Sequence, residues 1–571
     1  MKMLLQHLKK YKWYMIIGPF FKLLETILEL FNPLLVAQII DHGVESGDIN
    51  FIIRYGIIIL VANILGFAFS MICQKCASLT SAGVSNDLRA TLFEKISSFS
   101  HSELDKFGTA SLVNRLTNDI MQVETAVSIF IRLMIRVPFL LIGAFVLSLV
   151  INIKTSLIFL VLIPLMLVML VIYMRKTTPF FTKMRTKLDR ISKITKENLS
   201  GTRVIRAFNK QEDEEKRFSD ASEDYTATSI RVSKMTALLN PLIYLIVNIA
   251  TIALLYIGSI QINIGQMSQG DVIALIDYIA IITISLLILS QMIVLFVRTG
   301  ASVTRLDEVT KTEPSIQSTN TKRIKRTSYD AILEFKNVSF NYSNSDQDIS
   351  FIKNLSFSLY PKQTLGIIGG TGSGKTTIAN LITRFYDATQ GEVLYKGRNV
   401  KEYPISQLRE EISIVQQRST LFSGTLRENM KLRDKNASDE EIIEALKISQ
   451  AWSFVSEWTN GLDHQIMAGG KNVSGGQMQR LTIARAIIGK PELLVLDDSS
   501  SALDFLTDSN LRRELKKLDC TLVTISQRAT SIKNADLIIV LDNGDVVGMG
   551  KHNQLMKDCE IYREIYESQA K

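Results

Sequence analysis

Residues 364–384 read TLGIIGGTGSGKTTIANLITR and decide the fold of the C-terminal part of the chain. An apolar, strand-like run leads into the glycines and a helical run follows them, which is the setting of the pattern G-x-x-x-x-G-K-[ST]. Glycines let backbone N–H groups approach phosphate oxygens, and a helix N-terminus favours negative charge. The stretch predicts a phosphate-binding loop for a nucleoside triphosphate, formed by Gly369, Gly370, Thr371, Gly372, Ser373, Gly374, Lys375, Thr376 and Thr377.

Residues in this loop and further along the chain are predicted to neutralise the phosphates and to bind Mg²⁺. Lys375 carries the positive charge that neutralises the β and γ phosphates, and the Thr376 hydroxyl is a ligand for Mg²⁺. Further along, residues 493–498 read LLVLDD, an apolar strand that ends in Asp497 and Asp498. Carboxylates at the end of a strand beside a phosphate-binding loop hold Mg²⁺ and orient water. We therefore expect Asp497 to bind the metal ion together with Thr376.

The residues on either side of these motifs indicate how the chain divides into domains. From residue 332 onward, strand-like runs such as ILEFKNVSF alternate with helical stretches, as in an α/β domain. Residues 306–331 are polar and basic without an apolar period, which suits a linker. We expect a membrane domain at 1–305, a linker at 306–331 and a nucleotide-binding domain at 332–571.

Six long apolar runs precede residue 300, and each approaches the roughly 20 residues that a helix needs to cross a bilayer. They lie at 14–40, 52–79, 129–151, 156–174, 237–260 and 272–297. Lysines precede the first run and acidic residues follow it, which places the N-terminus in the cytosol, and six spans return the chain there. The segments 80–128 and 175–236 have apolar residues at helical spacing, so we expect the spanning helices to extend into the cytosol.

The composition agrees with a membrane part joined to a soluble part. The 571 residues are 47% hydrophobic, which is high for a soluble protein, and 21% charged, which is high for a chain wholly in lipid. Much of the Lys and Arg behind the net charge of +9 lies beside apolar runs, so no nucleic-acid partner is expected. The four cysteines are too few for a disulfide framework, and Cys73 and Cys76 are expected to pack within a helix.

Between the two phosphate-site motifs, residues 473–480 read VSGGQMQR. With those motifs this stretch resembles the ABC-transporter ATPase, whose signature LSGGQ has Val473 at its first position here. The resemblance implies that Tyr342 stacks on the adenine of ATP and that Gln417 is the Q-loop glutamine, a further Mg²⁺ ligand. It also implies that a signature made of Ser474, Gly475, Gly476 and Gln477 contacts ATP on a partner's phosphate-binding loop, and that the D-loop contains Ser501 and Asp504.

The resemblance extends to the membrane part. Residues 92–120 and 197–214 are similar to the two intracellular loops of ABC exporters with six spans per half, which implies coupling segments near 104–112 and 202–210. Import systems of this superfamily generally keep membrane and ATPase domains on separate chains, so the fused order implies export by analogy. The expected fold is an all-α polytopic membrane domain with six transmembrane helices extended into the cytosol, followed by an α/β P-loop ABC ATPase domain.

Two residues depart from the family pattern. Asp498 stands where a catalytic Glu usually follows the Walker B aspartate, and Gln527 stands where the switch-loop His is expected. Asp is one methylene shorter, which withdraws the carboxylate by more than about 1 Å, and such a misplacement can cost about 10²-fold in rate. Gln forms hydrogen bonds but cannot carry a proton. The sequence thus predicts that ATP binds here and turns over slowly or not at all.

The altered pair and the intact SGGQ together predict an obligate heterodimer. In this family two cassettes pair head to tail, so Ser474 and Gly476 would complete a competent site whose phosphate-binding loop and catalytic Glu come from a second half-transporter. Residues 468–472, AGGKN, lack the acidic residue common before the signature. This resembles the degenerate-site half of bacterial heterodimeric multidrug exporters, whose setting is the bacterial plasma membrane. A homodimer with two slow sites is the alternative.

The membrane domain says less about the cargo. Charged residues within spans usually face a cavity or pair with each other, which makes Glu25, Glu29 and Asp277 candidates for a substrate cavity. Instead of facing a cavity, Glu25 or Glu29 could form an ion pair with Lys22. Asp41 is either part of an outer gate or an ordinary helix-end residue. The expected cargo is small and hydrophobic or amphipathic. A lipid or peptide exporter and an ATP-gated channel or regulatory subunit remain alternatives.

Overall fold

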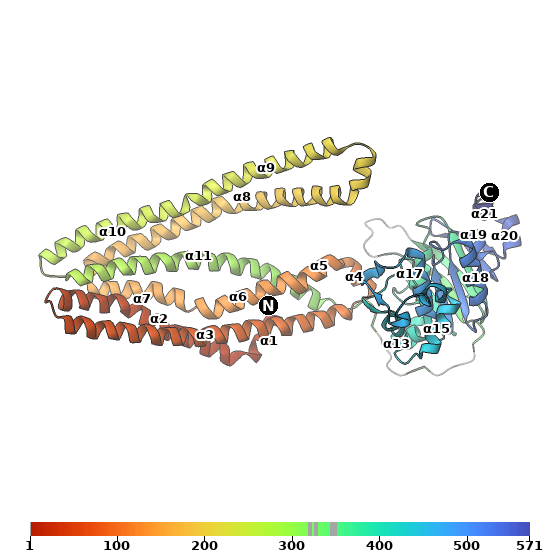
Figure 1. Cartoon of the computed structure of the whole chain (residues 1–571), viewed down its shortest axis with the longest axis horizontal. Coiled ribbons are helices and arrows are strands. Elements are labelled where there is room, and N and C mark those ends of the chain that lie inside the picture. Colours follow the sequence, from red (N-terminus) through yellow and green to blue (C-terminus); the bar gives the residue numbers. More distant parts are fainter. Residues whose placement is uncertain (1, 318–322, 325–328, 343–350, 571) are drawn as a thin grey trace. The chain divides into compact units, whose positions relative to one another are not determined.

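The computed structural model describes residues 2–317, 323–324, 329–342 and 351–570. The chain forms two compact units, of which the first comprises residues 1–95 and 110–311 and the second comprises 96–109 and 312–571 (Figure 1). The segment 96–109 therefore packs with the C-terminal unit although it lies between two helices of the first. The last long helix ends at Lys311. Residues 318–322 and 325–328 of the expected linker lie outside the described residues, so the linker's limits stay a prediction.

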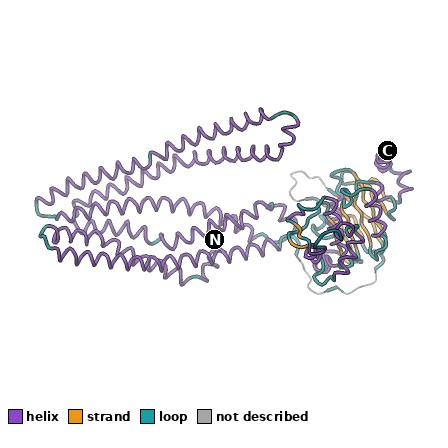
Figure 2. The backbone as a smooth tube through the Cα atoms, in the orientation of Figure 1, coloured by secondary structure: helices purple, strands orange, loops and turns teal. Residues whose placement is uncertain are grey.

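The described part of the first unit is helical, with two π-helical turns, η1 and η2 (Figure 2). Six of its helical segments are long and apolar enough to cross a membrane: Lys12–Val44, Ile49–Ser97, Thr109–Ile151, Ile153–Ala207, Gln211–Asn263 and Gln269–Lys311. The expectation of six spans is confirmed. The elements are α1 (Lys2–Lys10), α2 (Lys12–Gln38), η1 (Ile39–Val44), α3 (Ile49–Ser97), α5 (Thr109–Asn114), η2 (Arg115–Asp119), α6 (Ile120–Leu133), α7 (Arg136–Ile151), α8 (Ile153–Ala207), α9 (Gln211–Ala237), α10 (Leu239–Asn263) and α11 (Gln269–Lys311).

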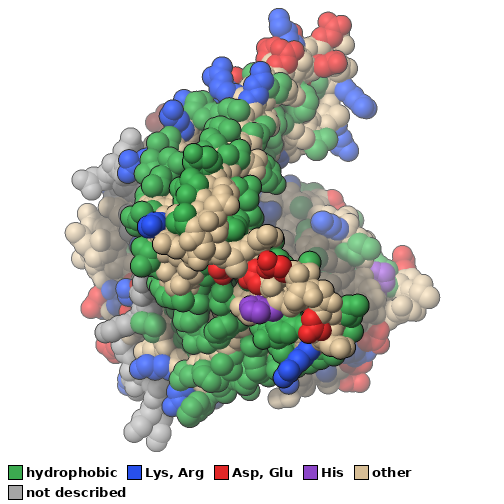
Figure 3. All heavy atoms as spheres, turned by 90° about the vertical axis from the view of Figure 1, so that its left-hand side faces the viewer, with side chains coloured by type: hydrophobic (Ala, Val, Ile, Leu, Met, Phe, Trp, Pro, Cys, Tyr) green, Lys and Arg blue, Asp and Glu red, His purple; other side chains and the backbone are tan. Residues whose placement is uncertain are grey.

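These helices exceed the thickness of a bilayer. α3 has 49 residues and α8 has 55, more than twice the roughly 20 that a span requires, so both continue well past their apolar sections. α11 is the central helix and packs against α2, α6, α7, α8 and α10. Its buried Tyr278 donates a hydrogen bond of 2.8 Å to the Leu30 carbonyl of α2. Hydrophobic side chains cover most of the helical surface that faces the viewer in Figure 3, as expected for contact with lipid.

Two larger sheets and a short strand pair make up the second unit, and the strands of Figure 2 lie only there. The six-stranded sheet has the order β12-β11-β3-β10-β9-β6, in which all strands but edge strand β12 run parallel. The antiparallel sheet has the order β2-β1-β4-β5. The bounds are β1 Leu333–Phe340, β2 Ile352–Leu359, β3 Thr364–Gly369, β4 Gln390–Tyr395, β5 Arg398–Asn399, β6 Ile412–Val415, β7 Gly424–Thr425, β8 Gln465–Ile466, β9 Leu493–Asp497, β10 Thr521–Ile525, β11 Leu537–Asp542 and β12 Asp545–Gly550.

A hydrophobic core joins the two larger sheets. It includes Phe335 and Phe357 of the antiparallel sheet, whose rings stack 4.7 Å apart, and Ile367 and Val495 of the parallel sheet. The helices of this unit are α4 (His101–Phe107), α12 (Lys375–Ile382), α13 (Ile405–Glu411), α14 (Leu426–Lys431), α15 (Asp439–Ile448), α16 (Trp452–Val455), α17 (Gly475–Ile487), α18 (Phe505–Leu515), α19 (Ala529–Ile532), α20 (His552–Asp558) and α21 (Glu560–Ala570). A helical membrane domain followed by an α/β nucleotide-binding domain is thereby confirmed.

Candidate functional site

The candidate site lies at the carboxyl ends of the parallel strands. β10 pairs with β3 on one side and β9 on the other, with Ile525 in register with Ile367 of β3 and with Asp497 of β9. The phosphate-binding loop follows β3, so it emerges at the same edge of the sheet where β9 ends in Asp497. In open α/β sheets this edge is where ligands bind.

Backbone conformation shapes the loop between β3 and α12. Gly374 precedes the first residue of α12 and has φ of 96°, a conformation that other residues rarely adopt. A Cβ at this position would lie 2.5 Å from the Phe351 carbonyl oxygen, so only glycine fits. The Lys375 side chain folds back over the loop, and its Nζ donates hydrogen bonds to the carbonyls of Gly369 at 2.9 Å and Gly370 at 2.5 Å.

The loop borders a cleft of about 210 Å³. The predicted residues that line it are Tyr342, Thr371, Gly372, Ser373, Gly374, Lys375, Thr376, Thr377, Gln417, Asp497, Asp498 and Gln527. Gly369 and Gly370 do not line the cleft, although their carbonyls hold Lys375. Phe351 and Ile525 line it too, and the sequence did not single them out. Phe351 is recognisable only in three dimensions, where its ring lies 5.1 Å from that of Tyr342.

Two of the three groups expected to bind Mg²⁺, those of Thr376 and Asp497, are neighbours. The Thr376 hydroxyl donates a hydrogen bond of 3.3 Å to Oδ1 of Asp497. Burial raises the pKa of the Asp497 carboxyl, against the lowering effect of that hydrogen bond. Burial also lowers the pKa of Lys375, although both aspartates oppose the shift. Oxygen donors beside a lysine are the set that a magnesium–phosphate complex requires, so the residues fit that group.

Asp498 and Gln527, the two departures from the family pattern, are brought together at this cleft. Burial raises the pKa of Asp498, while a hydrogen bond from the main chain of Gln527 acts to lower it. Asp498 has φ of 46°, a left-handed conformation that Asp tolerates better than longer side chains. Gln479 was not singled out from the sequence, yet its Nε2 donates to the Asp498 carbonyl at 3.3 Å and its Oε1 accepts from the Ala502 N–H at 3.2 Å.

The signature and D-loop residues lie outside this cleft. Ser474 caps α17, with its Oγ accepting from the Gln477 N–H at 3.3 Å and the Gln477 Oε1 accepting from the Ser474 N–H at 2.9 Å. Gly475 and Gly476 form the first turn of that helix. Asp504 caps α18, and Arg528 donates a hydrogen bond of 3.1 Å to the Ser501 carbonyl. None of these six residues lines the cleft around the chain's own phosphate-binding loop.

In the membrane domain, three of the four candidate acids have partners. Lys22 donates to both oxygens of Glu25 at 2.6 and 2.7 Å, which decides between the two pairings considered for this lysine. Glu29 pairs with Arg136 of α7 at 2.9 Å. Asp41 accepts from the Gly270 N–H at 2.7 Å, which ties the end of the first span to the start of α11. Asp277 is exposed on α11 and has no hydrogen-bond or ion-pair partner among the described residues.

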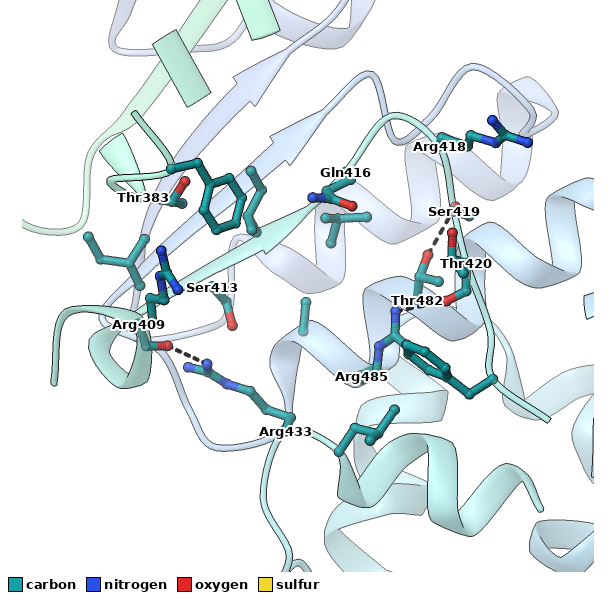
Figure 4. A pocket seen from close by; sticks show the side chains of 17 residues that line it. Thr383, Arg409, Ser413, Gln416, Arg418, Ser419, Thr420, Arg433, Thr482 and Arg485 are labelled. Carbon is teal, nitrogen blue, oxygen red and sulfur yellow. Dashed lines mark hydrogen bonds between the residues drawn. The ribbon is translucent and has the colours of Figure 1, made fainter. Parts of the chain in front are cut away.

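A second cleft, of about 370 Å³, lies beside α17 (Figure 4). Four arginines line it, Arg409, Arg418, Arg433 and Arg485, together with several hydroxyl side chains. Arg433 donates to the Arg409 carbonyl at 2.5 Å, and Arg485 donates to the Thr420 carbonyl at 3.0 Å. The Arg409 guanidinium lies 5.1 Å from the ring of Phe385. The sequence did not single out this cleft, because its residues come from segments without a shared motif.

Comparison with known proteins agrees with this geometry. The family profile for the ABC transporter transmembrane region matches residues 15–286, and that for the ABC transporter matches residues 352–501. The chain is 36% identical over 569 residues to the uncharacterized ABC transporter ATP-binding protein YfiB of Bacillus subtilis, covering 100% of this chain and 98% of the relative. It is 32% identical over 573 residues to the uncharacterized ABC transporter ATP-binding protein Rv1273c of Mycobacterium tuberculosis, covering 100% and 98%.

A relative with a described activity matches a smaller share of this chain. The ATP-dependent lipid A-core flippase of Pseudomonas fluorescens is 32% identical over 488 residues, which cover 85% of this chain and 80% of the relative. The chain therefore belongs to the ABC transporter family. It is a multi-pass, ATP-hydrolysing transporter of the exporter type, with an N-terminal transmembrane domain and a C-terminal ABC ATPase domain. Half-transporters of this type commonly act as dimers in the membrane.

Proposed function

We propose that this chain is one half of a heterodimeric exporter of small hydrophobic or amphipathic compounds and that its own ATP site is degenerate. The observation that carries the proposal is the pairing of Asp498 with Gln527 at a cleft whose phosphate-binding residues are intact. A short carboxylate and an amide take the places where a longer carboxylate and an imidazole would activate water. The site therefore binds ATP but hydrolyses it slowly or not at all.

At this site the residues predicted from the sequence have proposed roles. Tyr342 stacks on the adenine, the loop from Gly369 to Thr377 holds the phosphates, and Lys375 neutralises their charge. Thr376, Gln417 and Asp497 hold Mg²⁺, which supplies charge neutralisation at the phosphates when bound. Asp498 orients water poorly, so the ATP remains bound longer than in a competent site.

The signature would act on the partner's ATP rather than on this chain's own. Ser474 caps α17, Gly475, Gly476 and Gln477 form its first turn, and none of the four lines the chain's own cleft. Helix N-termini bind phosphate oxygens through free N–H groups. The partner is a second half-transporter whose catalytic Glu is intact, and Ser501 and Asp504 would form the D-loop contact with it.

Among the membrane acids, Asp277 supports the proposed export function best. The other three candidate acids are neutralised or hydrogen-bonded within the chain, whereas the Asp277 carboxylate lies on the open face of α11. A charged residue in contact with lipid is costly, about 2.5–3.5 kcal/mol at the centre of a helix, so this face lines a polar cavity. We expect Asp277→Asn to weaken cargo-stimulated ATPase activity more than Glu29→Gln does.

The orientation and location follow from the same proposal. Both termini lie in the cytosol, and the membrane is a bacterial plasma membrane. ATP binding closes the two cassettes, the cavity turns outward, and hydrolysis at the competent site resets the cycle. Lipid export is the second candidate, because a relative that matches 85% of this chain is an ATP-dependent lipid A-core flippase.

The proposal is tested by measuring ATPase activity of the purified chain alone and together with a half-transporter encoded beside it. Activity that requires the partner, and that falls when the partner's catalytic Glu is replaced by Gln, supports a heterodimer with a degenerate site here. Brisk turnover by the chain alone contradicts it and indicates a homodimer in which Asp498 suffices. Stimulation by cationic dyes or by phospholipid separates the two candidate cargo classes.

A further inference from the structure

The loop that carries Gln527 leaves the parallel sheet, so its main-chain groups need partners elsewhere. At the end of β10 the Ser526 N–H still donates to the Ile367 carbonyl of β3, at 3.1 Å. Further on, two groups of the loop are bonded to one side chain of α21, that of Gln569. Its Nε2 donates to the Gln527 carbonyl at 2.8 Å, and its Oε1 accepts from the Ala529 N–H at 2.8 Å.

This pair of hydrogen bonds, the Gln569 clamp, fixes the main chain on both sides of Arg528. Only one orientation of the amide satisfies both partners, because a carbonyl needs a donor and an N–H needs an acceptor. Ala529 is the first residue of α19, and the N-cap residue Arg528 makes no side-chain cap. Since the first N–H groups of a helix have no partners within it, Gln569 caps α19 from another helix.

α21 is itself held in place, which gives the Gln569 clamp a fixed origin. The helix packs against α19 and α20 (Figure 1). Tyr562 is fully buried, and its hydroxyl lies 2.9 Å from Nδ1 of His552. The Tyr566 hydroxyl accepts a hydrogen bond of 2.9 Å from Nζ of Lys533. Tyr562, Tyr566 and Gln569 are spaced i, i+4 and i+7, so the face of α21 that packs into the domain also carries the clamp.

The Gln569 clamp controls the direction of the Gln527 side chain. That side chain lines the ATP cleft and forms no hydrogen bond with any residue that the structure describes. Its direction therefore depends on its own main chain, which the clamp holds at the carbonyl. The main chain of Gln527 also donates a hydrogen bond to the carboxylate of Asp498. The clamp thus acts on Gln527 directly and on Asp498 through one main-chain hydrogen bond.

We infer that Gln569 is a positioning residue for ATP hydrolysis, which fixes where Gln527 lies in the cleft without touching the nucleotide. Gln569 is not among the residues that line the cleft. The phosphate-binding loop is held separately, by the bonds from Lys375 to its carbonyls, so loss of the clamp should leave ATP binding intact. The chemical step should slow, because it depends on the placement of the groups around the attacking water. This inference rests on the proposed role of Gln527 beside ATP.

The chain offers matched variants for the test. Gln569→Ala removes both bonds of the clamp. Gln569→Glu keeps an acceptor for the Ala529 N–H and loses the donor to the Gln527 carbonyl, because an ionised carboxylate only accepts. Tyr566→Phe is the control on the same face of α21, since it removes the bond to Lys533 and leaves the clamp in place.

The first measurement is amide hydrogen exchange on the full chain in lipid nanodiscs, which needs no hydrolysis. Exchange in peptides covering 526–532 should be about fivefold faster in Gln569→Ala than in wild type, the factor that one net hydrogen bond supplies. It should be unchanged in Tyr566→Phe. Protection of the phosphate-binding loop by Mg²⁺-ATP should be the same in all of these proteins.

The second measurement is steady-state phosphate release in the Asp498→Glu background, with a partner half-transporter whose own catalytic Glu is replaced by Gln. Turnover then comes from this chain's site. In Gln569→Ala and Gln569→Glu, kcat should fall about fivefold while KM for Mg²⁺-ATP stays within about twofold. When Gln527→Ala is also present, Gln569→Ala should lower kcat no further, because its effect passes through the Gln527 side chain. Tyr566→Phe should leave both constants unchanged.

The outcomes separate the inference from the function on which it rests. Unchanged exchange at 526–532 in Gln569→Ala would mean that the bonds from Arg528 to the Ser501 and Leu503 carbonyls hold the loop alone, and the inference is wrong. A rise in KM as large as the fall in kcat, or a further fall when Gln527→Ala is present, would give Gln569 a purely structural role and also contradict it.

Brisk turnover by the chain alone overturns the proposed degenerate site instead, and the same variants of that chain then test Gln569 without a partner. If Asp498→Glu shows no hydrolysis, the proposed reason for slow turnover fails, and the exchange measurement decides on Gln569 by itself.

Discussion

The Thr376 hydroxyl lies 3.3 Å from Oδ1 of Asp497, although 121 residues separate the two in the chain. The contact joins the first turn of α12 to the end of β9, so it places an alcohol and a carboxylate side by side at the mouth of the phosphate-binding loop. Both are oxygen donors of the kind that Mg²⁺ selects.

Asp497 should make the effect of Mg²⁺ on ATP binding depend on pH. Asp497→Asn should retain binding of ATP without metal and lose the tightening caused by Mg²⁺, because an amide is a weaker ligand for a hard cation. Burial raises the pKa of the Asp497 carboxyl above its ordinary 3.8. As pH falls, the wild-type protein should therefore lose the Mg²⁺-dependent increase in ATP affinity at a higher pH than it would with an exposed aspartate. Fluorescent-ATP titrations with and without Mg²⁺ measure both effects. If Asp497→Asn loses ATP affinity over the same acidic pH range, the titrating group belongs to the nucleotide and not to Asp497.

Asp498→Glu should increase ATP hydrolysis by as much as about 10²-fold, because the longer side chain carries the carboxylate to the attacking water. The variant should also lose stability by about 1 kcal/mol, since Glu tolerates the φ of 46° at this position less well than Asp does. Phosphate release and thermal unfolding measure the two effects. Asp498→Asn is the control, with no gain in rate expected. A wild-type rate equal to that of Asp498→Glu would show that the site is not degenerate.

Lys375 should make ATP binding sensitive to alkaline pH. Burial lowers the pKa of its ammonium below the ordinary 10.5, so as pH rises the positive charge is lost earlier than on an exposed lysine. Affinity for ATP should fall through that lowered pKa. Lys375→Arg keeps the charge at high pH and should flatten the profile, although its geometry lowers affinity overall. A profile that falls identically in both proteins would place the titration elsewhere.

Lys22 and Glu25 should depend on each other. Lys22 is 7% exposed and its ammonium lies 2.6 Å from Glu25, whose side chain is 16% exposed, so Lys22→Met leaves a partly buried carboxylate without its cation, which should cost up to about 3 kcal/mol. The double variant Lys22→Met with Glu25→Met should recover most of that loss. Thermal unfolding in detergent measures the cycle. Lys210→Met removes one partner of a pair that is exposed on both sides, and no measurable loss is expected there. If the double variant loses as much stability as the two single variants together, the two residues do not stabilise each other and the pairing is contradicted.

Much of the architecture could be predicted because it depends on local patterns. The spans appear as apolar runs of the required length, and the loop from Gly369 to Thr377 has a spacing that works only between a strand and a helix. The fold class and the six spans were predicted correctly for this reason. Gln479 was overlooked because its partners, Asp498 and Ala502, are recognisable only once α17 has packed beside the end of β9.

The sequence by itself determined that this chain is a six-span membrane protein with a phosphate-binding α/β domain, because span length and loop spacing are properties of consecutive residues. Only the tertiary structure decided that Glu25 pairs with Lys22 while Glu29 pairs with Arg136, 107 residues away. It also decided that Asp277 is left on an open face of α11 and that Gln569 reaches both Gln527 and Ala529. The physical reason is that such contacts depend on how separate helices and sheets pack, and packing joins residues whose positions in the chain carry no common period.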